Sequence, residues 1–169
     1  MNVALIIPPL VSRSNDVLGS GIFYMPISMA YLAGALRADG HDVHVHDLFA
    51  MAPTRLTYDG PMVRQGMPID RFLKQSLLNA DIAFVFSWGA TSFQPLIELT
   101  QGIKAKRPGV PVVIVENAQA VFALALSKVA RALLEAGADY VILGECEERA
   151  RALVSYLEGT GPLPDDGMC

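Results

Sequence analysis

The stretch Pro26–Leu48, PISMAYLAGALRADGHDVHVHDL, decides the fold of this chain. Its first part carries apolar residues at helical spacing from Ile27 to Leu36, and it ends at Gly40, a residue type that commonly follows the last turn of a helix. Its last part, Asp42–Asp47, alternates polar and apolar side chains, which indicates an edge strand with one covered face. A helix that passes through a glycine directly into a strand is typical of an α/β fold.

Strands and helices alternate on both sides of this stretch. Before it, Asn2–Ile7 is a short apolar run that ends at two prolines, as a buried strand of a parallel sheet does. After it, Leu48–Pro68 is predicted to be a long loop because glycine and proline recur in it. The remaining predicted strands are Asp81–Ser87, Pro111–Glu116 and Asp139–Leu143, and the remaining predicted helices are Ile69–Asn79, Phe93–Lys106, Ala120–Ala136 and Cys146–Leu157.

This order predicts a flavodoxin-like (Rossmann-like) α/β domain, with a five-stranded parallel sheet in the order 2-1-3-4-5 and helices on both faces. The length of 169 residues suits one domain, which we expect to span residues 1–158, followed by a linker or tail at 159–169. A composition of 52% hydrophobic and 18% charged residues suits a sheet that is covered on both faces.

Composition and charge argue against several classes of function. The net charge of −4 comes with no basic stripe, so nucleic acid is not an expected partner. No apolar run is long enough to span a membrane and the first residues do not have the pattern of a secretory signal, so we expect a cytoplasmic protein. The two cysteines do not have the spacing of a metal or iron–sulfur site, and His41, His44 and His46 on or beside an edge strand are interpreted as solvated side chains. No metal site is expected.

Ligands of such folds bind outside the carboxyl ends of the strands, near the point where the strand order reverses. We therefore expect the binding residues in the four loops that follow the first, third, fourth and fifth strands, and the first of these loops, Pro8–Tyr24, is long and rich in serine and glycine. The candidates are Pro9, Ser12, Ser20 and Gly21, then Ser87, Trp88, Gly89 and Thr91, then Glu116, Asn117 and Ala118, and finally Gly144 and Glu145. Trp88 either packs flat against a large planar cofactor or closes the end of the core, and Glu145 either binds the ligand or favours the start of the following helix.

The chain resembles one family, the amino-terminal cobalamin-binding domain of cobalamin-dependent radical S-adenosylmethionine enzymes. The resemblance covers residues 1–158. It is carried by VALIIPPL, PISMAYLAGALRADGHDVHVHDL, ADIAFVFSWGATSF, KRPGVPVVIVENAQA and ADYVILGECEERARALVSYLEG, of which the second and the last are the most specific.

The resemblance implies that the loops hold the corrin of cobalamin (vitamin B12) across the carboxyl ends of the strands, with the nucleotide tail inserted into the domain. It also implies a partner, a radical S-adenosylmethionine catalytic domain or subunit that carries the 4Fe-4S cluster and S-adenosylmethionine, and a role in methyl transfer or related chemistry. The Cys-x-x-x-Cys-x-x-Cys signature of that partner is absent from this sequence, so we do not expect the chain to be catalytic alone.

Two departures from the family of cobalamin proteins bear on this expectation. No Asp-x-His-x-x-Gly motif follows the first strand, so the expected state is base-off without a histidine ligand, with Trp88 a candidate for the lower face. The loop at Val115–Ala118 lacks the glycine pair that the family usually carries, and such a loop approaches a ligand less closely. The alternative is a flavodoxin-like interaction or regulatory domain that has lost the cofactor. A receiver is not expected, because Pro8 and Pro9 stand where it needs an acidic pair. A flavodoxin is not expected either, because the loop Pro8–Tyr24 has the residue types of a phosphate loop but not its compact arrangement.

Overall fold

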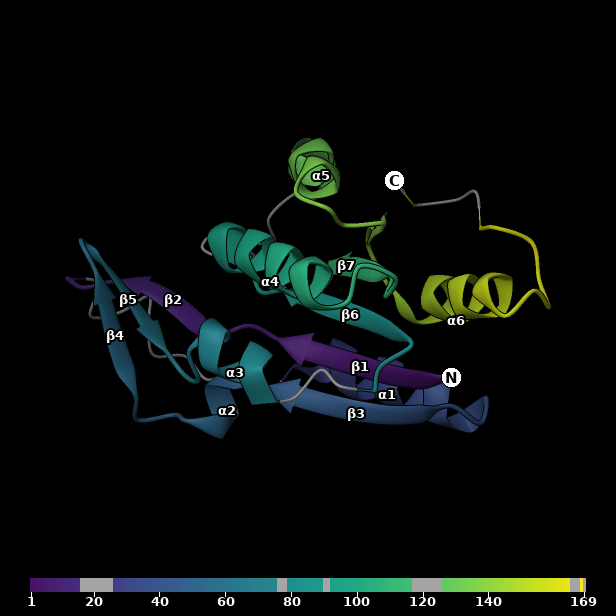
Figure 1. Cartoon of the computed structure of the whole chain (residues 1–169), viewed down its shortest axis with the longest axis horizontal. Coiled ribbons are helices and arrows are strands. Elements are labelled where there is room, and N and C mark those ends of the chain that lie inside the picture. The colour runs from purple at the N-terminus through teal and green to yellow at the C-terminus, as the bar shows by residue number, and fades with distance from the viewer. Residues whose placement is uncertain (16–25, 76–78, 90–91, 117–125, 165–167, 169) are drawn as a thin grey trace.

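The computed structural model describes residues 1–15, 26–75, 79–89, 92–116, 126–164 and 168. In chain order, the elements are β1 (Asn2–Ile7), β2 (Leu10–Arg13), α1 (Ile27–Ala38), β3 (Asp42–Asp47), α2 (Leu48–Met51), β4 (Leu56–Asp59), β5 (Met62–Gln65), α3 (Ile69–Gln75), β6 (Ile82–Ser87), α4 (Phe93–Lys106), β7 (Val112–Glu116), α5 (Leu126–Glu135), β8 (Tyr140–Ile142) and α6 (Glu147–Leu157). Figure 1 shows these elements as one parallel sheet between helices, with a small second sheet beyond the end of β1.

The large sheet has five strands in the order β3-β1-β6-β7-β8, and all neighbours are parallel. These labels differ from 2-1-3-4-5 because β2, β4 and β5 belong to the second sheet. Counted within the large sheet alone, its strands follow the flavodoxin-like order. The predicted α/β fold class is confirmed, and the carboxyl ends of β1, β6, β7 and β8 meet at one edge.

Helices cover both faces of this sheet, because successive strand residues point to opposite sides. On β1, Val3, Leu5 and Ile7 pack into the core under α1 and α6, whereas Ala4 and Ile6 pack into the core under α3, α4 and α5. Each face therefore has its own apolar core, and the central strands are buried between the two. This double burial explains why their sequences are continuous apolar runs.

The prediction of a long loop at Leu48–Pro68 is wrong, because this stretch contains α2, β4 and β5. The start of the predicted loop Pro8–Tyr24 is likewise a strand, β2, and residues 16–25 lie outside the described part of the chain. β2, β5 and β4 form an antiparallel sheet in that order. Gly60 and Pro61, which indicated a loop in the sequence, form the two-residue turn between β4 and β5.

Gly66 joins this small sheet to the rest of the domain. It follows β5 with a φ of 131°, and a Cβ at this position would lie 2.6 Å from the carbonyl oxygen of Leu48. The next N–H, that of Met67, donates a hydrogen bond to the same carbonyl. Only glycine allows so close an approach of two backbones, so the end of β5 packs directly on α2.

Two predicted helices are described only in part. The helix predicted at Ile69–Asn79 is described as α3, with 76–78 outside the described residues and Asn79 in a turn, and the helix predicted at Ala120–Ala136 is described as α5, with 120–125 outside the described residues. In the stretch 159–169, Met168 forms an antiparallel bridge with Ile142 at the free edge of β8. No helix in the described part of the chain is both long and apolar enough to cross a membrane.

Candidate functional site

The loop after β6 is held by a serine at the start of α4. The hydroxyl of Ser92 donates to the carbonyl oxygen of Gly89 at 2.6 Å and accepts from the N–H of Gly89 at 3.2 Å. The Ser87 hydroxyl lies 3.4 Å from the hydroxyl oxygen of Ser92, and Ser87, Gly89 and Ser92 are all buried. Ser87 and Gly89, both predicted to bind a ligand, therefore stabilise the loop internally. Ser92 was not among the residues predicted from the sequence, because its place directly before a predicted helix was its only signal.

Trp88 connects the loop after β6 to the end of β1. Its indole N–H donates to the carbonyl oxygen of Pro8 at 3.2 Å, and its ring meets that of Phe86 edge-on, with centroids 5.5 Å apart. The ring packs against the core under α1 and α6 and keeps partial exposure. Of the two interpretations of Trp88, these contacts support the one in which it closes the end of the core.

Glu116, the last residue of β7, links three elements at the carboxyl edge. Its two carboxylate oxygens accept hydrogen bonds from the backbone N–H of Gly144 at 2.7 Å and of Leu126 at 3.1 Å. Gly144 begins the loop after β8 with a φ of 70°, and Leu126 begins α5. A carboxylate thus stands where the resemblance leads one to expect glycines, and it fixes the loop after β8 relative to α5.

The side chain of Arg149 also holds the loop after β8. The guanidinium of Arg149 donates to the carbonyl oxygens of Leu143 at 3.1 Å and Glu145 at 2.8 Å. Arg149 lies in the first turns of α6, so the loop and the helix that follows it form one fixed unit. Sequence reasoning did not select Arg149, because a single arginine on an amphipathic helix carries no specific signal.

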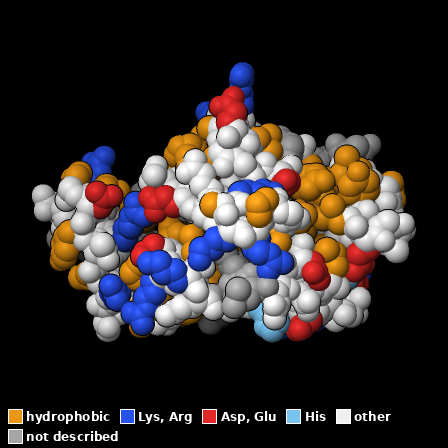
Figure 2. Space-filling view, in the orientation of Figure 1, with side chains coloured by type: hydrophobic (Ala, Val, Ile, Leu, Met, Phe, Trp, Pro, Cys, Tyr) orange, Lys and Arg blue, Asp and Glu red, His pale blue; other side chains and the backbone are white. Residues whose placement is uncertain are grey.

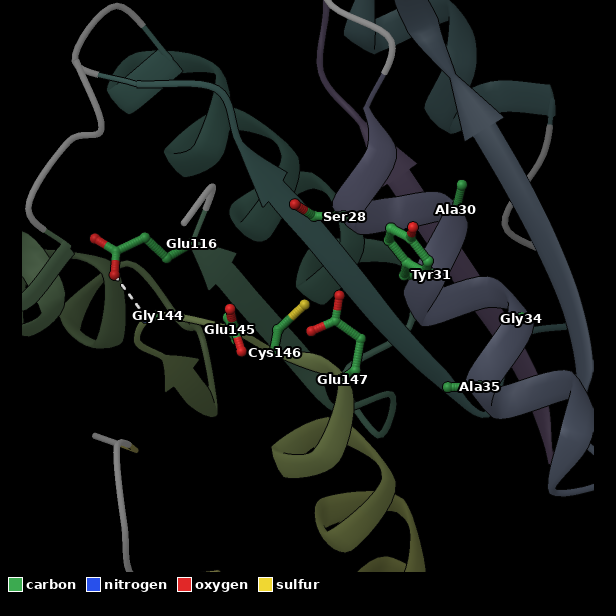
Figure 3. Close-up of a pocket in the computed structure, with 10 residues that line it drawn as sticks. All are labelled: Ser28, Ala30, Tyr31, Gly34, Ala35, Glu116, Gly144, Glu145, Cys146 and Glu147. Atoms are coloured by element: carbon green, nitrogen blue, oxygen red, sulfur yellow. Dashed lines mark hydrogen bonds between the residues drawn. The ribbon is translucent and has the colours of Figure 1, made fainter. Parts of the chain in front are cut away.

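A pocket of about 540 Å³ opens between α1 and α6 beside the carboxyl ends of β7 and β8 (Figure 3). Its lining comes from four places: the outer face of α1, the end of β7, the loop after β8 and the start of α6. The lining residues are Ser28, Ala30, Tyr31, Gly34, Ala35, Glu116, Gly144, Glu145, Cys146 and Glu147. Three residues of α1 in this lining, Ala30, Gly34 and Ala35, are small, and a Cβ added to Gly34 would meet no atom within 4 Å. The pocket exists because α1 carries small side chains there.

The structure brings some of the predicted binding residues together and separates others. Glu116, Gly144 and Glu145 line the pocket between α1 and α6, whereas Pro9 and Ser12 lie elsewhere, Ser12 on β2 opposite Val63. The predicted residues Ser20, Gly21, Thr91, Asn117 and Ala118 lie outside the described residues. The α1 residues of the pocket were not predicted, because an alternation of small and apolar residues on a helix is also what an ordinary packed helix shows.

A second pocket, of about 680 Å³, lies between the small sheet and helices α3 and α4. Its floor is mainly apolar, with Met67, Ile69 and Leu73, and its wall carries a bidentate ion pair in which Arg64 donates to both carboxylate oxygens of Glu98. The hydrogen bonds from Arg64 hold the pKa of Glu98 below its ordinary value. Figure 2 shows side chains of both charges gathered on this part of the surface. The pair fastens β5 to α4, so it fixes the small sheet against the domain.

The histidines do not form a metal site in the described part of the chain. There, no group of three or more histidine, cysteine, aspartate or glutamate side chains is placed to hold a metal ion. His44 lies 3.2 Å from a carboxylate oxygen of Asp42 on the exposed strand, whereas the ring of His46 packs on Phe72 with centroids 5.3 Å apart. Burial lowers the pKa of His46, and the neighbouring His44 adds to the effect. His46 is thus a packed side chain rather than the solvated one that we predicted.

Cys146 is the N-terminal flanking residue of α6 and lines the pocket between α1 and α6, yet it is only 1% exposed. Burial, with the nearby Glu147 adding to it, raises the pKa of its thiol from 9.0 to about 12. A thiol of this kind is protonated at neutral pH and is a weak nucleophile. Cys146 therefore serves the core and is no candidate for a reactive cysteine.

We expect the raised pKa of Cys146 to make the protein less stable in alkaline solution. Up to about pH 9 the thiol is protonated in both states, but above it the unfolded chain loses the proton while the folded chain keeps it. The free energy of unfolding should then fall by up to about 1.4 kcal/mol for each further pH unit. Urea denaturation from about pH 8 to about pH 10, compared with the Cys146→Ala variant, measures this. Equal pH slopes for the two proteins would contradict the assignment.

Comparison with known protein families gives no match for this sequence, and comparison with curated proteins gives none either. The function must therefore be argued from the residues and the pocket.

Proposed function

We propose that this chain is a cobalamin-binding domain that acts with a radical S-adenosylmethionine catalytic domain or subunit in methyl transfer or related chemistry. The observation that carries the proposal is the pocket between α1 and α6, which opens at the carboxyl edge of a flavodoxin-like sheet. The resemblance of the sequence to such domains leads to the expectation of a cofactor tail inserted into the domain, and this pocket is an opening of suitable size for it.

The residues of the pocket fit the proposed ligand in size and in polarity. Ala30, Gly34 and Ala35 leave a shallow wall on α1, so a flat aromatic base has room beside the helix. On the opposite side, the first turn of α6 presents backbone N–H groups that lack partners within the helix, and such groups suit a phosphate or an amide oxygen. Ser28 and Tyr31 add hydroxyl groups near the same opening (Figure 3).

In this proposal the loops at the carboxyl edge support the corrin, which would supply the methyl-carrying chemistry when bound. Trp88 and Glu116 keep the loops after β6 and β8 in place through their hydrogen bonds to the backbone. The sequence directly after β1, residues 8–25, contains no histidine, which supports a base-off state without a histidine ligand from that segment. A cytoplasmic location remains part of the proposal.

One observation favours a second candidate, an interaction or regulatory domain without the cofactor. Among the described residues, the pocket is lined by three carboxylates, Glu116, Glu145 and Glu147, and by no lysine or arginine. The nucleotide tail carries a negative phosphodiester, which these side chains would repel unless the N-terminus of α6 outweighs them.

Titration of the purified chain with hydroxocobalamin separates the two candidates. Trp88 is the single tryptophan of the chain, so its fluorescence reports on one site at the carboxyl edge. We expect saturable quenching of Trp88 and a change in the visible spectrum of the corrinoid at micromolar concentration. Hydroxocobalamin at about 100 µM begins to fill even weak sites of about −5.5 kcal/mol. If neither the quenching nor the spectral change occurs up to this concentration, the result favours the domain without cofactor.

A further inference from the structure

The strand β4 forms an open edge of the small sheet. It is the outermost strand in the order β2-β5-β4, and among the described residues no further strand pairs with it. It stands at the margin of the molecule in Figure 1. All four of its residues are exposed, including Leu56 at 48% and Tyr58 at 68%. Natural edge strands are commonly protected by lysine, proline or a bulge, and the sequence of β4, LTYD, contains neither residue type.

The pairing of β4 with β5 fixes which backbone groups face outward. The N–H of Gly66 donates to the carbonyl oxygen of Arg55 at 3.0 Å, so the carbonyl group of Arg55 faces the β5 side. In an antiparallel pair this orientation alternates along the strand, so Thr57 and Asp59 also face β5. The N–H and C=O groups of Leu56 and Tyr58 therefore point away from the sheet, toward solvent.

From this arrangement we infer that two copies of this chain associate through β4, pairing antiparallel about a twofold axis with Thr57 opposite Thr57 of the second copy. The outward backbone groups of Leu56 and Tyr58 then form hydrogen bonds with those of Tyr58 and Leu56 in the other copy. The two small sheets join into one continuous six-stranded sheet. The contact is isologous, as most interfaces between identical subunits are.

The side chains of β4 are complementary to themselves in this register. Residues directly opposite each other lie on the same face of the sheet. On one face, Leu56 meets Tyr58 of the second copy, and the twofold axis repeats this apolar pair. On the other face, threonine meets threonine, and Arg55 stands opposite Asp59 of the second copy, again twice. Each of these pairings is favourable between strands.

The neighbouring registers lose these contacts. A relative shift of the two strands by one residue would place outward backbone groups opposite inward ones, so the ladder of hydrogen bonds could not form. A relative shift by two residues that places Tyr58 opposite Tyr58 also places Leu56 opposite Gly60, and it removes the pairing of Arg55 with Asp59. Asp59 forms an ion pair with Arg64 at 3.5 Å, which Glu98 also holds, and its side chain is 71% exposed, so it remains accessible to Arg55 of the second copy.

The association should be weak and concentration-dependent. Four residues on each strand bury less than the roughly 1,200 Å² at the lower end of stable interfaces, so a dissociation constant in the upper micromolar range is expected. Sedimentation velocity from about 10 µM to about 1 mM measures it directly. An unchanged sedimentation coefficient over this range would overturn the proposal.

Variants of β4 test both the strand pairing and its register. Tyr58→Pro removes an N–H that points to the second copy but leaves the bonds to β5, so it should weaken association by about tenfold or more. Arg55→Asp and Asp59→Arg each oppose like charges and should weaken self-association by several fold, whereas an equimolar mixture of the two variants should associate at least as well as the unchanged protein. Circular dichroism checks that each variant is folded.

Two outcomes would overturn the register or the surface. Association that Tyr58→Pro leaves unchanged would place the contact on another surface of the molecule. A mixture of Arg55→Asp with Asp59→Arg that associates no better than each variant alone would exclude the pairing of Arg55 with Asp59. The matched control is Arg131→Asp on α5, an exposed arginine whose ion pair with Glu135 lies away from the small sheet, and it should associate like the unchanged protein.

Discussion

Replacement of Gly34 by leucine is expected to abolish binding of hydroxocobalamin while the protein stays folded. Gly34 lies on the face of α1 that lines the pocket between α1 and α6, and a Cβ there would meet no atom within 4 Å. The first atom of an added side chain thus fits without displacing any part of the protein, and we expect the rest of a leucine side chain to extend into the pocket. Affinity for the corrinoid should fall by at least about tenfold, a loss of about 1.4 kcal/mol.

The same substitution should stabilise the protein slightly, which separates a blocked pocket from a damaged fold. Glycine within a helix costs about 1 kcal/mol relative to good helix formers, so Gly34→Leu should raise the free energy of unfolding by about 0.5–1 kcal/mol. Gly34→Ala should show the gain in stability with a smaller loss of affinity. Ala105→Leu, at an exposed position of α4 on the opposite face of the sheet, is the control for an added leucine. Gly34→Leu protein that binds hydroxocobalamin normally would show that the tail does not use this pocket.

Replacement of Glu116 by leucine is expected to lower the free energy of unfolding by about 1–3 kcal/mol, the range for leaving buried backbone donors without an acceptor. The N–H groups of Gly144 and Leu126 both donate to its carboxylate. Because Glu116 is only half-buried, water replaces part of the lost hydrogen bonding, so the loss should stay within this range. Urea denaturation measures the change, and Glu116→Gln, which keeps one acceptor oxygen, should lose about half as much.

Glu145 supplies the matched control for this prediction. It lines the same pocket, but its side chain is exposed, and its backbone carbonyl accepts a hydrogen bond from Arg149. Glu145→Leu should therefore change the free energy of unfolding by less than about 0.5 kcal/mol, the usual range for surface substitutions. Similar losses for Glu116→Leu and Glu145→Leu would contradict the assignment of Glu116 as the residue that fixes the loop after β8.

The parallel sheet could be predicted from the sequence because its strands are buried on both faces. The runs at β1, β6 and β7 are nearly continuous apolar segments between helices with one apolar face, and this pattern has few other solutions. The small sheet could not be predicted in the same way. The residues of β4 and β5 are exposed or half-buried, so burial imposes no alternation on their sequence, and Gly60 and Pro61 between them are also typical of loops.

Only part of the lining of the pocket between α1 and α6 was among the residues predicted from the sequence. The rule that ligands bind at the carboxyl ends of parallel strands selected the loops that contain Glu116 and Gly144. It could not select Gly34 or Cys146, because the pocket arises from the packing of α1 against α6, and these helices are far apart in the chain. Nor could it show that the Ser92 hydroxyl contacts both Ser87 and Gly89, since these hydrogen bonds depend on how the chain turns after β6.

The two partners of β5 have consequences for the order in which this protein folds. β4 joins β5 through a two-residue turn, so this hairpin closes a very short loop and can form within microseconds. β2 reaches β5 only when Leu10 meets Gln65, which requires the intervening chain to be ordered first. The hairpin should thus exist early with both of its edges open, and the late arrival of β2 would leave β4 as the edge that stays exposed throughout folding.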